Sequence, residues 1–500
     1  MSHNSGDVFE RLYNSPQRSH VRRVASSQLP APKRCPSRCK IDSIEQLYRL
    51  LFERDPNLFS IKDYGWEISH RPSLNIDDIP LSNLNVFERG ELMRKRSVYY
   101  VPTTSTFPTA ATAQREIKLT DYEDNFGFDD VSGNYKVNLN DHINYRYQVL
   151  RNVGKGSFGK VILVQDHKVA GDDFLLALKI INNNPAASLQ SVNEIKMLKC
   201  IKDHGGHRNV VEFFNQFNFR SHICITTELL SLNLYSLLEV TKFQGFSAPV
   251  VAQFGRQILQ GISFLHGHSI IHCDIKPENI MVKLPADHES TELNVKLIDF
   301  GSSCFDNEQC FSYIQSRFYR APEIILGAEY NNKIDIWSVG CVLAELFTGV
   351  PLLPGKNEID QVGLILGIFG APKSCTIQRF RSQLAKSFQP TTMDIESRSV
   401  LPHANQIKKT LLYKIFDQNG KINLQILNQY KAATPDLTSL KKQFRLNSKT
   451  LDICMGIAGD GTDNPLDKQS SMTRFLQKIF VWDPMARESA DALLADSFLS

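Results

Sequence analysis

Two short polar motifs, each set inside apolar sequence, restrict the fold of this chain more than any other feature. The first reads Ile-His-Cys-Asp-Ile-Lys-Pro-Glu-Asn-Ile over residues 271–280, and the second reads Leu-Ile-Asp-Phe-Gly over residues 297–301. Charged groups within apolar sequence must be paired or must bind a metal, because an isolated buried charge is costly. Any fold for this chain has to supply such partners.

The residue types in these motifs suit chemistry on a phosphate group. Asp274 is placed to accept a proton from a hydroxyl group, and Lys276 can neutralise charge on a transferred phosphoryl group. Asn279 and Asp299 offer the hard oxygen ligands that Mg²⁺ prefers. We expect these residues, distant along the chain, to converge around the terminal phosphate of a nucleotide.

Two upstream segments fit the same chemistry. Glycines at 154, 156 and 159 lie between two strand-like stretches, and a Gly-rich turn lets backbone N–H groups approach phosphate oxygens. Taken alone, this pattern fits a plain hairpin without a ligand equally well. Lys179 stands in the apolar run 174–181 and needs an anionic partner, and Glu194 lies in a helix-like segment fifteen residues later. A Lys179–Glu194 pair would hold the ammonium against the α- and β-phosphates.

Two further motifs follow in the same order. Ala-Pro-Glu occupies residues 321–323, and Asp335 opens the buried-looking helix Asp-Ile-Trp-Ser-Val-Gly. Arg487 is available to pair with Glu323. In this order and spacing, the whole set of motifs resembles that of the eukaryotic protein kinases over about residues 145–499. The resemblance implies an α+β, bilobal fold with a small β-rich lobe and a larger helical lobe, and it implies ATP and Mg²⁺ as cofactors.

Finer features resemble one kinase group. Cys273 stands beside Asp274 where most kinases have Arg, and Asp299 opens Asp-Phe-Gly-Ser-Ser-Cys. Together with residues 242–247, 313–323 and 351–361, these features resemble the dual-specificity tyrosine-regulated kinases (DYRK) of the CMGC group, and class II members most. Residues 138–150 resemble the acidic-His box that precedes the catalytic domain in that family. Homeodomain-interacting kinases are the nearest competing group.

The resemblance assigns roles to residues of this chain. Asp274 and Lys276 act on the substrate hydroxyl and the phosphoryl group, Lys179 and Glu194 align ATP, and Asn279 and Asp299 bind Mg²⁺. The nucleotide-binding residues are Val153, Gly154, Lys155, Gly156, Ser157, Phe158, Gly159, Val161, Ala177, Lys179, Glu228, Leu230 and Met281.

The resemblance also implies autophosphorylation of a tyrosine in the activation loop. The matching residue is Tyr313, and Phe311 replaces the second tyrosine that family members commonly have. A phosphotyrosine carries about −1.5 to −2 charge, and Arg317 and Arg320 are spaced to bind it. They can also be read as generic loop arginines. Ser236 replaces an acidic residue of the family, so the preference for a substrate Arg upstream of the target site is open, although Glu278 remains available.

The domain organisation follows from changes in composition. Residues 1–40 hold eight Lys or Arg against two acidic residues and lack periodicity, so we expect a disordered basic tail. Residues 41–120 read as an accessory region and linker, with a helix expected to start at Ser43 and a second folded stretch at 84–102. We place the acidic-His box region at 121–146 and the kinase domain at 147–499, divided into an N-lobe (147–230) and a C-lobe (231–499) with an insert at about 375–470.

Composition excludes several classes of protein. With 42% hydrophobic and 22% charged residues, wholesale disorder and collagen-like repeats are excluded, and no apolar run reaches the ~18 residues of a membrane span. The first twenty residues lack the apolar core of a signal peptide, and ten scattered Cys fit a reducing compartment. We therefore expect a cytoplasmic or nuclear protein. Two readings of the tail stay open, a solvated extension and a segment that binds an acidic partner, and we expect no membrane or nucleic-acid partner.

The function predicted from the sequence is Mg²⁺- and ATP-dependent phosphorylation of Ser and Thr in protein substrates, with a preference for a following Pro and with autophosphorylation of Tyr313. The alternative is a catalytically silent pseudokinase scaffold. Such scaffolds usually lack the Lys, the catalytic Asp or the metal-binding Asp, and this chain has all three. A small-molecule kinase is disfavoured by the long segment from Asp299 to Glu323, which builds a platform for protein substrates.

Overall fold

The computed structural model describes most of the chain and divides it into two compact units. In the part described, the first unit comprises residues 48–232 and 282–294, and the second comprises residues 40–47, 233–281 and 295–500. The described residues are 40–54, 70–102, 122–156, 159–170, 174–284, 293–308, 314–387, 410–433, 446–447, 450–457 and 466–500. The expected basic tail therefore lies outside the described residues, except for Lys40.

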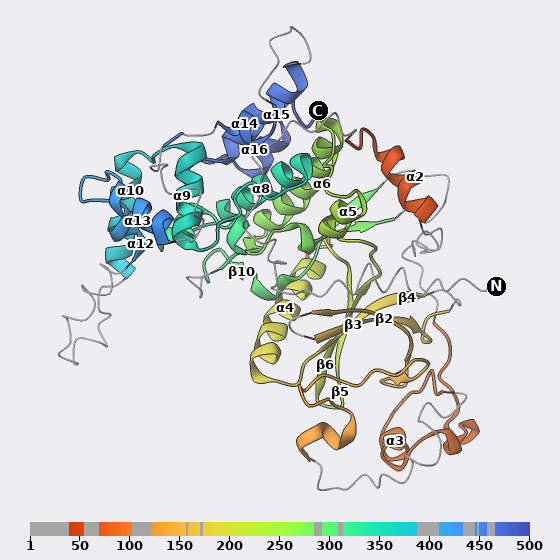
Figure 1. Ribbon diagram of the computed structural model, residues 1–500. Coiled ribbons are helices and arrows are strands. Elements are labelled where there is room, and N and C mark those ends of the chain that lie inside the picture. Colours follow the sequence, from red (N-terminus) through yellow and green to blue (C-terminus); the bar gives the residue numbers. More distant parts are fainter. Residues whose placement is uncertain are drawn as a thin grey trace, which may run out of the picture. The chain divides into compact units, whose positions relative to one another are not determined.

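The first unit is built on a six-stranded antiparallel sheet with the strand order β1-β2-β3-β4-β6-β5 (Figure 1). Its helices are α3 (Val86–Leu92), which precedes the sheet in sequence, and α4 (Pro185–Asp203), which connects β4 to β5. The strands are β1 (His142–Ile143), β2 (Tyr147–Gly156), β3 (Gly159–Asp166), β4 (Leu175–Ile181), β5 (Phe213–Phe219) and β6 (His222–Glu228).

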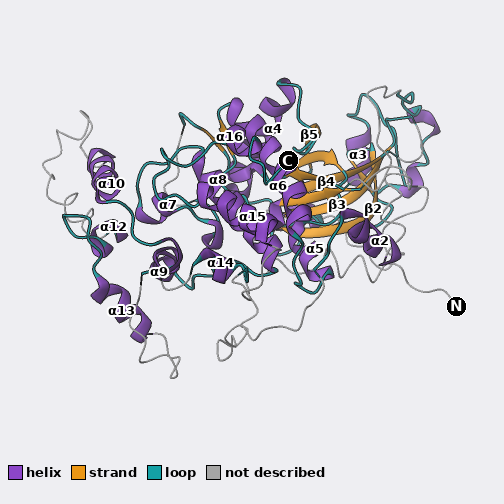
Figure 2. Ribbon diagram, turned by 90° about the horizontal axis from the view of Figure 1, so that it is seen from above, coloured by secondary structure: helices purple, strands orange, loops and turns teal. Residues whose placement is uncertain are grey.

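The second unit is mainly helical. Helix α8 is mainly apolar and is buried on all sides from Ile334 to Phe347, which is typical of a central core helix. It packs against α6 and α15, and these helices lie together in both ribbon views (Figures 1 and 2). The helices are α5 (Leu234–Val240), α6 (Ala248–Gly267), α7 (Pro322–Leu326), α8 (Lys333–Thr348), α9 (Glu358–Phe369), α10 (Ser374–Ser387), α12 (Leu411–Ile415), α13 (Leu424–Ala433), α14 (Leu451–Cys454), α15 (Leu466–Ile479) and α16 (Ala490–Leu494).

Short strands and a first helix complete the chain. Strand β7 (Ile270–Ile271) pairs with β10 (Cys304–Phe305), and β8 (Ile280–Lys283) pairs with β9 (Asn294–Leu297). Helix α2 (Ile44–Arg54) starts where it was predicted: Ser43 Oγ accepts the Gln46 N–H, and Gln46 Oε1 accepts the Asp42 N–H. These two hydrogen bonds satisfy two backbone N–H groups where the helix begins.

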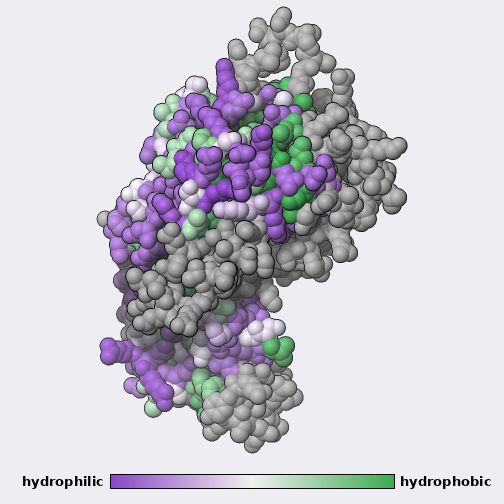
Figure 3. All heavy atoms as spheres, turned by 90° about the vertical axis from the view of Figure 1, so that its left-hand side faces the viewer, coloured by the Kyte–Doolittle hydropathy of each residue, from purple (hydrophilic) through white to green (hydrophobic). Residues whose placement is uncertain are grey.

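The expected fold class is confirmed by these two units, one rich in β-structure and one helical. The expected insert at 375–470 contains short helices from α10 to α14, and its residues 388–409, 434–445, 448–449 and 458–465 lie outside the described part. No helix among the described residues is long and apolar enough to cross a membrane. On the face drawn in Figure 3, hydrophilic side chains predominate, with smaller hydrophobic groups between them.

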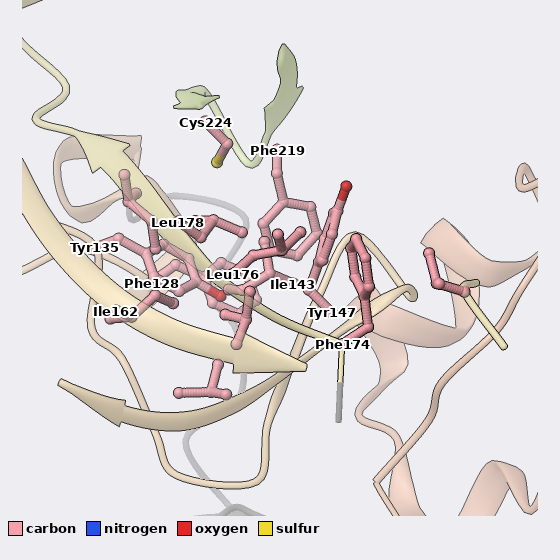
Figure 4. Packing of buried hydrophobic residues seen from close by; sticks show 14 residues of the cluster. Phe128, Tyr135, Ile143, Tyr147, Ile162, Phe174, Leu176, Leu178, Phe219 and Cys224 are labelled. Carbon is pink, nitrogen blue, oxygen red and sulfur yellow. The ribbon is translucent and has the colours of Figure 1, made fainter. Parts of the chain in front are cut away.

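The alternation of strand β4 decides which side chains enter the core. Leu176, Leu178 and Ile180 are buried on one face of the sheet, and the period of two puts Ala177 and Lys179 on the other. Figure 4 shows Leu176 and Leu178 gathered in this core with aromatic side chains from before the first strand, Phe128 and Tyr135 among them.

The accessory stretch at 84–102 also folds, as a small satellite of the first unit. Helix α3 starts with a capping box between Asn85 and Glu88. The segment has its own apolar cluster, which consists of Ile79, Leu84, Leu92, Val98, Val101 and Tyr145. The buried Arg220 guanidinium joins this segment to the sheet, because it donates to Glu88 Oε1 at 3.0 Å and to Glu91 Oε2 at 2.9 Å. Arg220 also lies over the Phe128 ring, 3.9 Å from its centroid.

A first prediction concerns the buried ion pair in the second unit. Arg487 donates to both carboxylate oxygens of Glu323, at 2.8 and 3.0 Å, as expected from the sequence, and neither side chain is exposed. Replacing Arg487 by Ala leaves a buried carboxylate unpaired, which should lower the unfolding free energy by about 3–5 kcal/mol. Urea unfolding followed by tryptophan fluorescence would measure this. Lys478→Ala, which removes a surface pair with Asp496, is the control; an equal loss in both variants would contradict the prediction.

A second prediction concerns Glu345, a buried residue of α8 that accepts a hydrogen bond from the Tyr319 hydroxyl at 2.7 Å. Burial, reinforced by the nearby Glu278 carboxylate, raises the pKa of Glu345 from 4.5 to about 7. Between these values the folded protein keeps a proton that the unfolded chain releases, so stability is lost as the pH rises through this window.

Replacing Glu345 by Gln should remove that loss while keeping an acceptor for Tyr319. The variant should gain up to about 3 kcal/mol over the wild type at pH 8 and little at pH 5. Urea unfolding of both proteins at the two pH values would measure the difference. A gain that is the same at pH 5 and pH 8 would show that Glu345 does not titrate in this range.

Candidate active site

The first unit contains the predicted lysine–glutamate pair. Lys179 lies on the face of β4 opposite the apolar core, and Glu194 lies in the middle of α4. The Lys179 ammonium donates to both carboxylate oxygens of Glu194, at 2.9 and 2.7 Å. The predicted contact is therefore present, and it leaves the ammonium partly exposed, with 22% of the side chain accessible.

The glycine-rich segment is a hairpin between β2 and β3. Its strands remain paired up to Gly156 and Gly159, and Ser157 and Phe158 at its tip lie outside the described residues. A side chain at 159 is excluded, because a Cβ there would lie 2.0 Å from the Ile180 carbonyl oxygen. Other residues of the predicted set sit on this hairpin and on β4, namely Val153, Gly154 and Lys155 on β2, Val161 on β3 and Ala177 on β4.

The last residue of β6, Glu228, and Leu230 just after the strand are the remaining nucleotide-binding candidates of the first unit. Glu228 is committed to structural contacts through its side chain, since its carboxylate pairs with Lys283 Nζ at 3.0 Å and accepts the Glu212 N–H at 2.8 Å. A role in nucleotide binding therefore falls to backbone groups of Glu228 and Leu230. Met281 belongs to β8 and forms an isolated bridge with Asn233.

The second unit brings three candidate residues, Asp274, Lys276 and Asn279, together with Ser316. Asp274 Oδ2 accepts from Lys276 Nζ at 2.7 Å and from Asn279 Nδ2 at 3.2 Å. Its other oxygen, Oδ1, accepts from the Ser316 backbone N–H at 3.1 Å and from the Ser316 hydroxyl at 2.8 Å. Asp274 therefore already accepts a hydrogen bond from an aliphatic hydroxyl group, beside a lysine ammonium.

Asp274 and Lys276 each stabilise the charged form of the other. Burial alone would raise the pKa of Asp274, but the Lys276 ammonium and hydrogen bonds from Lys276 and Ser316 outweigh it and lower the pKa below its usual value. Burial would likewise lower the pKa of Lys276, and Asp274 raises it instead. Both groups are consequently charged at neutral pH.

The backbone ties the two candidate metal ligands to each other. The Ile298 N–H donates to the Asn279 carbonyl at 3.0 Å, and His272 Nε2 lies 3.0 Å from the Ile298 carbonyl oxygen. Asp299 follows directly, with a φ of 64°, and the buried Phe300 ring packs near the His272 ring. Because Asn279 Nδ2 is used by Asp274, its Oδ1 is the atom available for a cation. Two oxygen donors of this kind fit Mg²⁺.

Sequence reasoning missed the residues that hold this loop. Asp335, at the start of α8, accepts the backbone N–H of His272 at 2.8 Å and that of Cys273 at 2.9 Å. Cys273 has a φ of 66°, which is unusual for a residue with a side chain, and its Sγ lies 3.7 Å from Cys304 Sγ. The position of Asp335 next to a buried helix was visible in the sequence, but nothing there indicated its backbone partners.

The predicted phosphate-binding arginines are both engaged in the second unit. Arg320 is buried and donates to the carbonyl oxygens of Ile314 and Gln315 at 2.9 and 2.7 Å. Arg317 and Arg320 each lie 3.4 Å from Glu358 Oε1. Tyr313 lies outside the described residues.

The residues considered for substrate recognition also lie in the second unit. Ser236 is buried in the first turn of α5, where its N–H is capped by Asn233. Glu278 is half-buried, and burial followed by the nearby Asp274 charge raises its pKa. Of the two positions considered for binding a substrate Arg, only position 278 therefore carries an acidic side chain. Position 236 carries a buried serine.

The family model "Protein kinase domain" matches residues 147–499. The kinase mbk-2 of Caenorhabditis elegans, a dual specificity tyrosine-phosphorylation-regulated kinase, is 44% identical over 288 residues, which cover 57% of this chain and 33% of that protein. Human dual specificity tyrosine-phosphorylation-regulated kinase 3 is 42% identical over 308 residues, 61% of this chain and 49% of that protein.

A fission yeast relative aligns over more of this chain. The serine/threonine-protein kinase ppk5 of Schizosaccharomyces pombe is 35% identical over 426 residues, which cover 85% of this chain and 43% of that protein. The chain therefore spans between a third and a half of the length of these relatives. The predicted resemblance to the DYRK group is confirmed by these matches, and by the family match and its fold the chain belongs to the protein kinase domain family.

Proposed function

We propose that this chain is a Mg²⁺- and ATP-dependent protein kinase that phosphorylates Ser and Thr residues of protein substrates. The observation that carries the proposal is the set of contacts around Asp274: a carboxylate kept ionised by Lys276, accepting a hydrogen bond from a serine hydroxyl, with Asn279 beside it. The names of the relatives, two of them dual specificity kinases and one a serine/threonine kinase, support the same class of reaction.

The geometry suggests how each side chain contributes. Asp274 orients the substrate hydroxyl and takes its proton as the oxygen bonds to the γ-phosphorus of ATP and the bond from that phosphorus to ADP breaks. Lys276 offsets negative charge on the phosphoryl group. Lys179, held by Glu194, binds phosphate oxygens of ATP. Asn279 and Asp299 would hold Mg²⁺, which neutralises phosphate charge when it is bound. Catalysis of this kind depends mainly on positioning and charge stabilisation.

The pseudokinase alternative finds less support. The three residues whose loss usually marks a pseudokinase, Lys179, Asp274 and Asp299, are present in this chain. Lys179 and Asp274 have the ion-pair partners described above. Phosphoryl transfer to a basic protein substrate by the full chain with ATP and Mg²⁺ would separate the two functions directly.

Several finer properties stay proposals that rest on the sequence. They are the preference for a Pro after the target residue, the binding of an acidic partner by the basic tail, and residence in the cytoplasm or the nucleus. Peptide libraries with and without a following Pro, and with and without an upstream Arg, would test the substrate preferences. Equal rates for the Arg-containing and Arg-free peptides would indicate that Glu278 does not compensate for Ser236.

The central prediction is that Asp274→Asn abolishes most turnover and spares nucleotide binding. Asn keeps the shape of the side chain but cannot take a proton, and such a group typically contributes 10²–10⁴-fold to the rate. We expect kcat to fall by about that factor while the Kd for ATP changes less than threefold. Asp77→Asn, an exposed aspartate of the first unit, is the control. Near-normal kcat in Asp274→Asn would remove Asp274 from its proposed role.

A further prediction is that the purified wild-type chain contains phosphate on Tyr313, placed there by its own activity. Intact and peptide mass spectrometry of bacterially produced protein should show one phosphotyrosine, and Asp274→Asn protein should show none. Tyr313→Phe should lower kcat by about tenfold, since a phosphate bound by Arg317 or Arg320 forms one or more charge-assisted hydrogen bonds. An active wild-type protein with unmodified Tyr313 would contradict this part of the proposal.

A further inference from the structure

A polar turn ahead of the kinase domain contacts both elements that carry the Lys179–Glu194 pair. The turn comprises residues 129–134, Asp-Asp-Val-Ser-Gly-Asn, and is called the Asp129 turn below. It lies outside the segment 147–499 that matches the protein kinase domain. All its contacts described here lie within the first unit.

Hydrogen bonds within the turn hold its backbone in one conformation. The Asp130 carboxylate accepts the backbone N–H groups of Ser132 and Asn134 at 2.9 and 3.0 Å, together with the Asn134 side-chain amide. Gly133 has a φ of 72°, which a residue without a side chain adopts at no steric cost. On either side of the turn, Phe128 and Tyr135 are buried in the core of the sheet with Leu176 and Leu178, as Figure 4 shows.

The Asp129 turn forms hydrogen bonds to the connection between β4 and α4. The Asn183 N–H donates to the Gly133 carbonyl at 2.9 Å, and the Asn182 side-chain amide donates to the Ser132 carbonyl at 2.8 Å and to Asn134 Oδ1 at 3.0 Å. The approach is close, because a Cβ at Gly133 would lie 3.3 Å from Asn182 Oδ1.

The hydrogen bonds continue from this connection into α4. Asn184 Nδ2 donates to Asn182 Oδ1 at 2.7 Å. Asn184 is also the N-cap of α4, and its Oδ1 accepts the Ala187 N–H at 2.7 Å. The first turn of the helix is therefore fixed relative to the Asp129 turn, and Glu194 lies about 10 Å further along the same rigid helix.

The same turn is also bound to the end of β4. Asp129 Oδ1 lies 2.7 Å from His222 Nε2, and His222 Nδ1 lies 2.6 Å from the carbonyl oxygen of Ile181, two residues after Lys179. A carbonyl oxygen can only accept, and the Asp129 carboxylate already accepts from Asn125 Nδ2. His222 Nδ1 therefore donates to Ile181, and the buried imidazole ring links Asp129 to the strand of Lys179.

The N-terminal half of α4 needs such an anchor. Its buried residues there are the small Ala187 and Ser191, whereas Leu189 and Val192 are 72% and 56% exposed. The Lys179–Glu194 pair adds one side-chain contact at the end of this half, with 22% and 9% of the two side chains accessible. Larger apolar side chains are buried only from Ile195 onward.

We propose that the Asp129 turn is a positioning element that holds α4 against β4 so that Glu194 keeps Lys179 in place for the nucleotide. The inference rests on the proposed kinase function, because it assigns the turn a part in aligning ATP. Asn182 and Gly133 are positioning residues in this scheme, since they act through Glu194 and do not touch the substrate.

The test uses a double-mutant cycle in the full chain, with ATP, Mg²⁺ and a basic protein substrate. Asn182→Ala removes the two side-chain bonds to the turn, and Asn218→Ala, an exposed asparagine of β5, is the matched control. We expect Asn182→Ala to lower kcat/KM for ATP about tenfold in the wild-type background and less than twofold in a Glu194→Gln background. A merely structural role would lower activity by the same factor in both backgrounds, and that result would overturn the proposal.

A second readout does not depend on activity. Hydrogen exchange of the backbone amides of residues 188–195 should be at least fivefold faster in Asn182→Ala than in the wild type, and unchanged in Asn218→Ala. Gly133→Ala, which crowds Asn182, is the milder variant should Asn182→Ala fail to fold. If the wild type transfers no phosphate, the proposed function fails, and faster exchange would still support the anchoring of α4. Unchanged exchange in both turn variants would refute the anchoring itself.

Discussion

The carboxylate of Asp335 is the interaction on which the second unit's chemistry depends. It is fully buried at the start of α8 and accepts the backbone N–H groups of His272 and Cys273, with His266 Nε2 3.0 Å from Oδ2. A residue with a side chain pays of order 1–3 kcal/mol for a sparsely populated backbone conformation such as that of Cys273. The two hydrogen bonds to a buried carboxylate offset that cost, and the bend at Cys273 leads directly into Asp274.

Helix α8 also positions part of the segment after Asp299 through hydrogen bonds. Gln315 Nε2 donates to Ser338 Oγ at 2.8 Å, and the Ser338 hydroxyl donates to the Tyr319 carbonyl at 2.7 Å. Ser316, between these anchors, is thereby held against Asp274. One mainly apolar helix with a few buried polar groups thus sets the positions of the loop that carries Asp274 and of residues 315–319.

The sequence predicted the residues whose chemistry is concentrated in short motifs. Asp274, Lys276 and Asn279 lie within six residues of one another, and their mutual contacts follow from one tight loop. Lys179 could be paired with Glu194 because a charge in an apolar strand needs a partner, and the Ser43 cap follows a local rule. Tyr313 and the tip of the hairpin at 157–158 lie outside the described residues, so those predictions stay open.

What the sequence did not reveal depends on contacts between distant loops. The Asp129 turn, Arg220 and Asp335 act through partners that are tens of residues to more than a hundred residues away, and these partners include both side chains and backbone N–H groups. Asn, Asp and Gly in a loop have no periodicity to read, and they are typical of any surface turn. The sequence therefore indicated the residues proposed to carry the chemistry. The residues that hold them in position were identified only from the tertiary structure.

The contacts of the Arg220 guanidinium bear on which residues must be present for the kinase domain to fold. Its carboxylate partners, Glu88 and Glu91, come from a helix more than fifty residues ahead of the family match. A fragment cut at residue 147 would retain the cation beside Phe219 but lose both of these counter-charges, together with the Phe128 ring under the guanidinium and the Tyr135 hydroxyl that accepts from it. The boundary of homology and the boundary of cooperative folding therefore differ in this chain, and the shortest fragment expected to fold on its own includes the helix at 86–92.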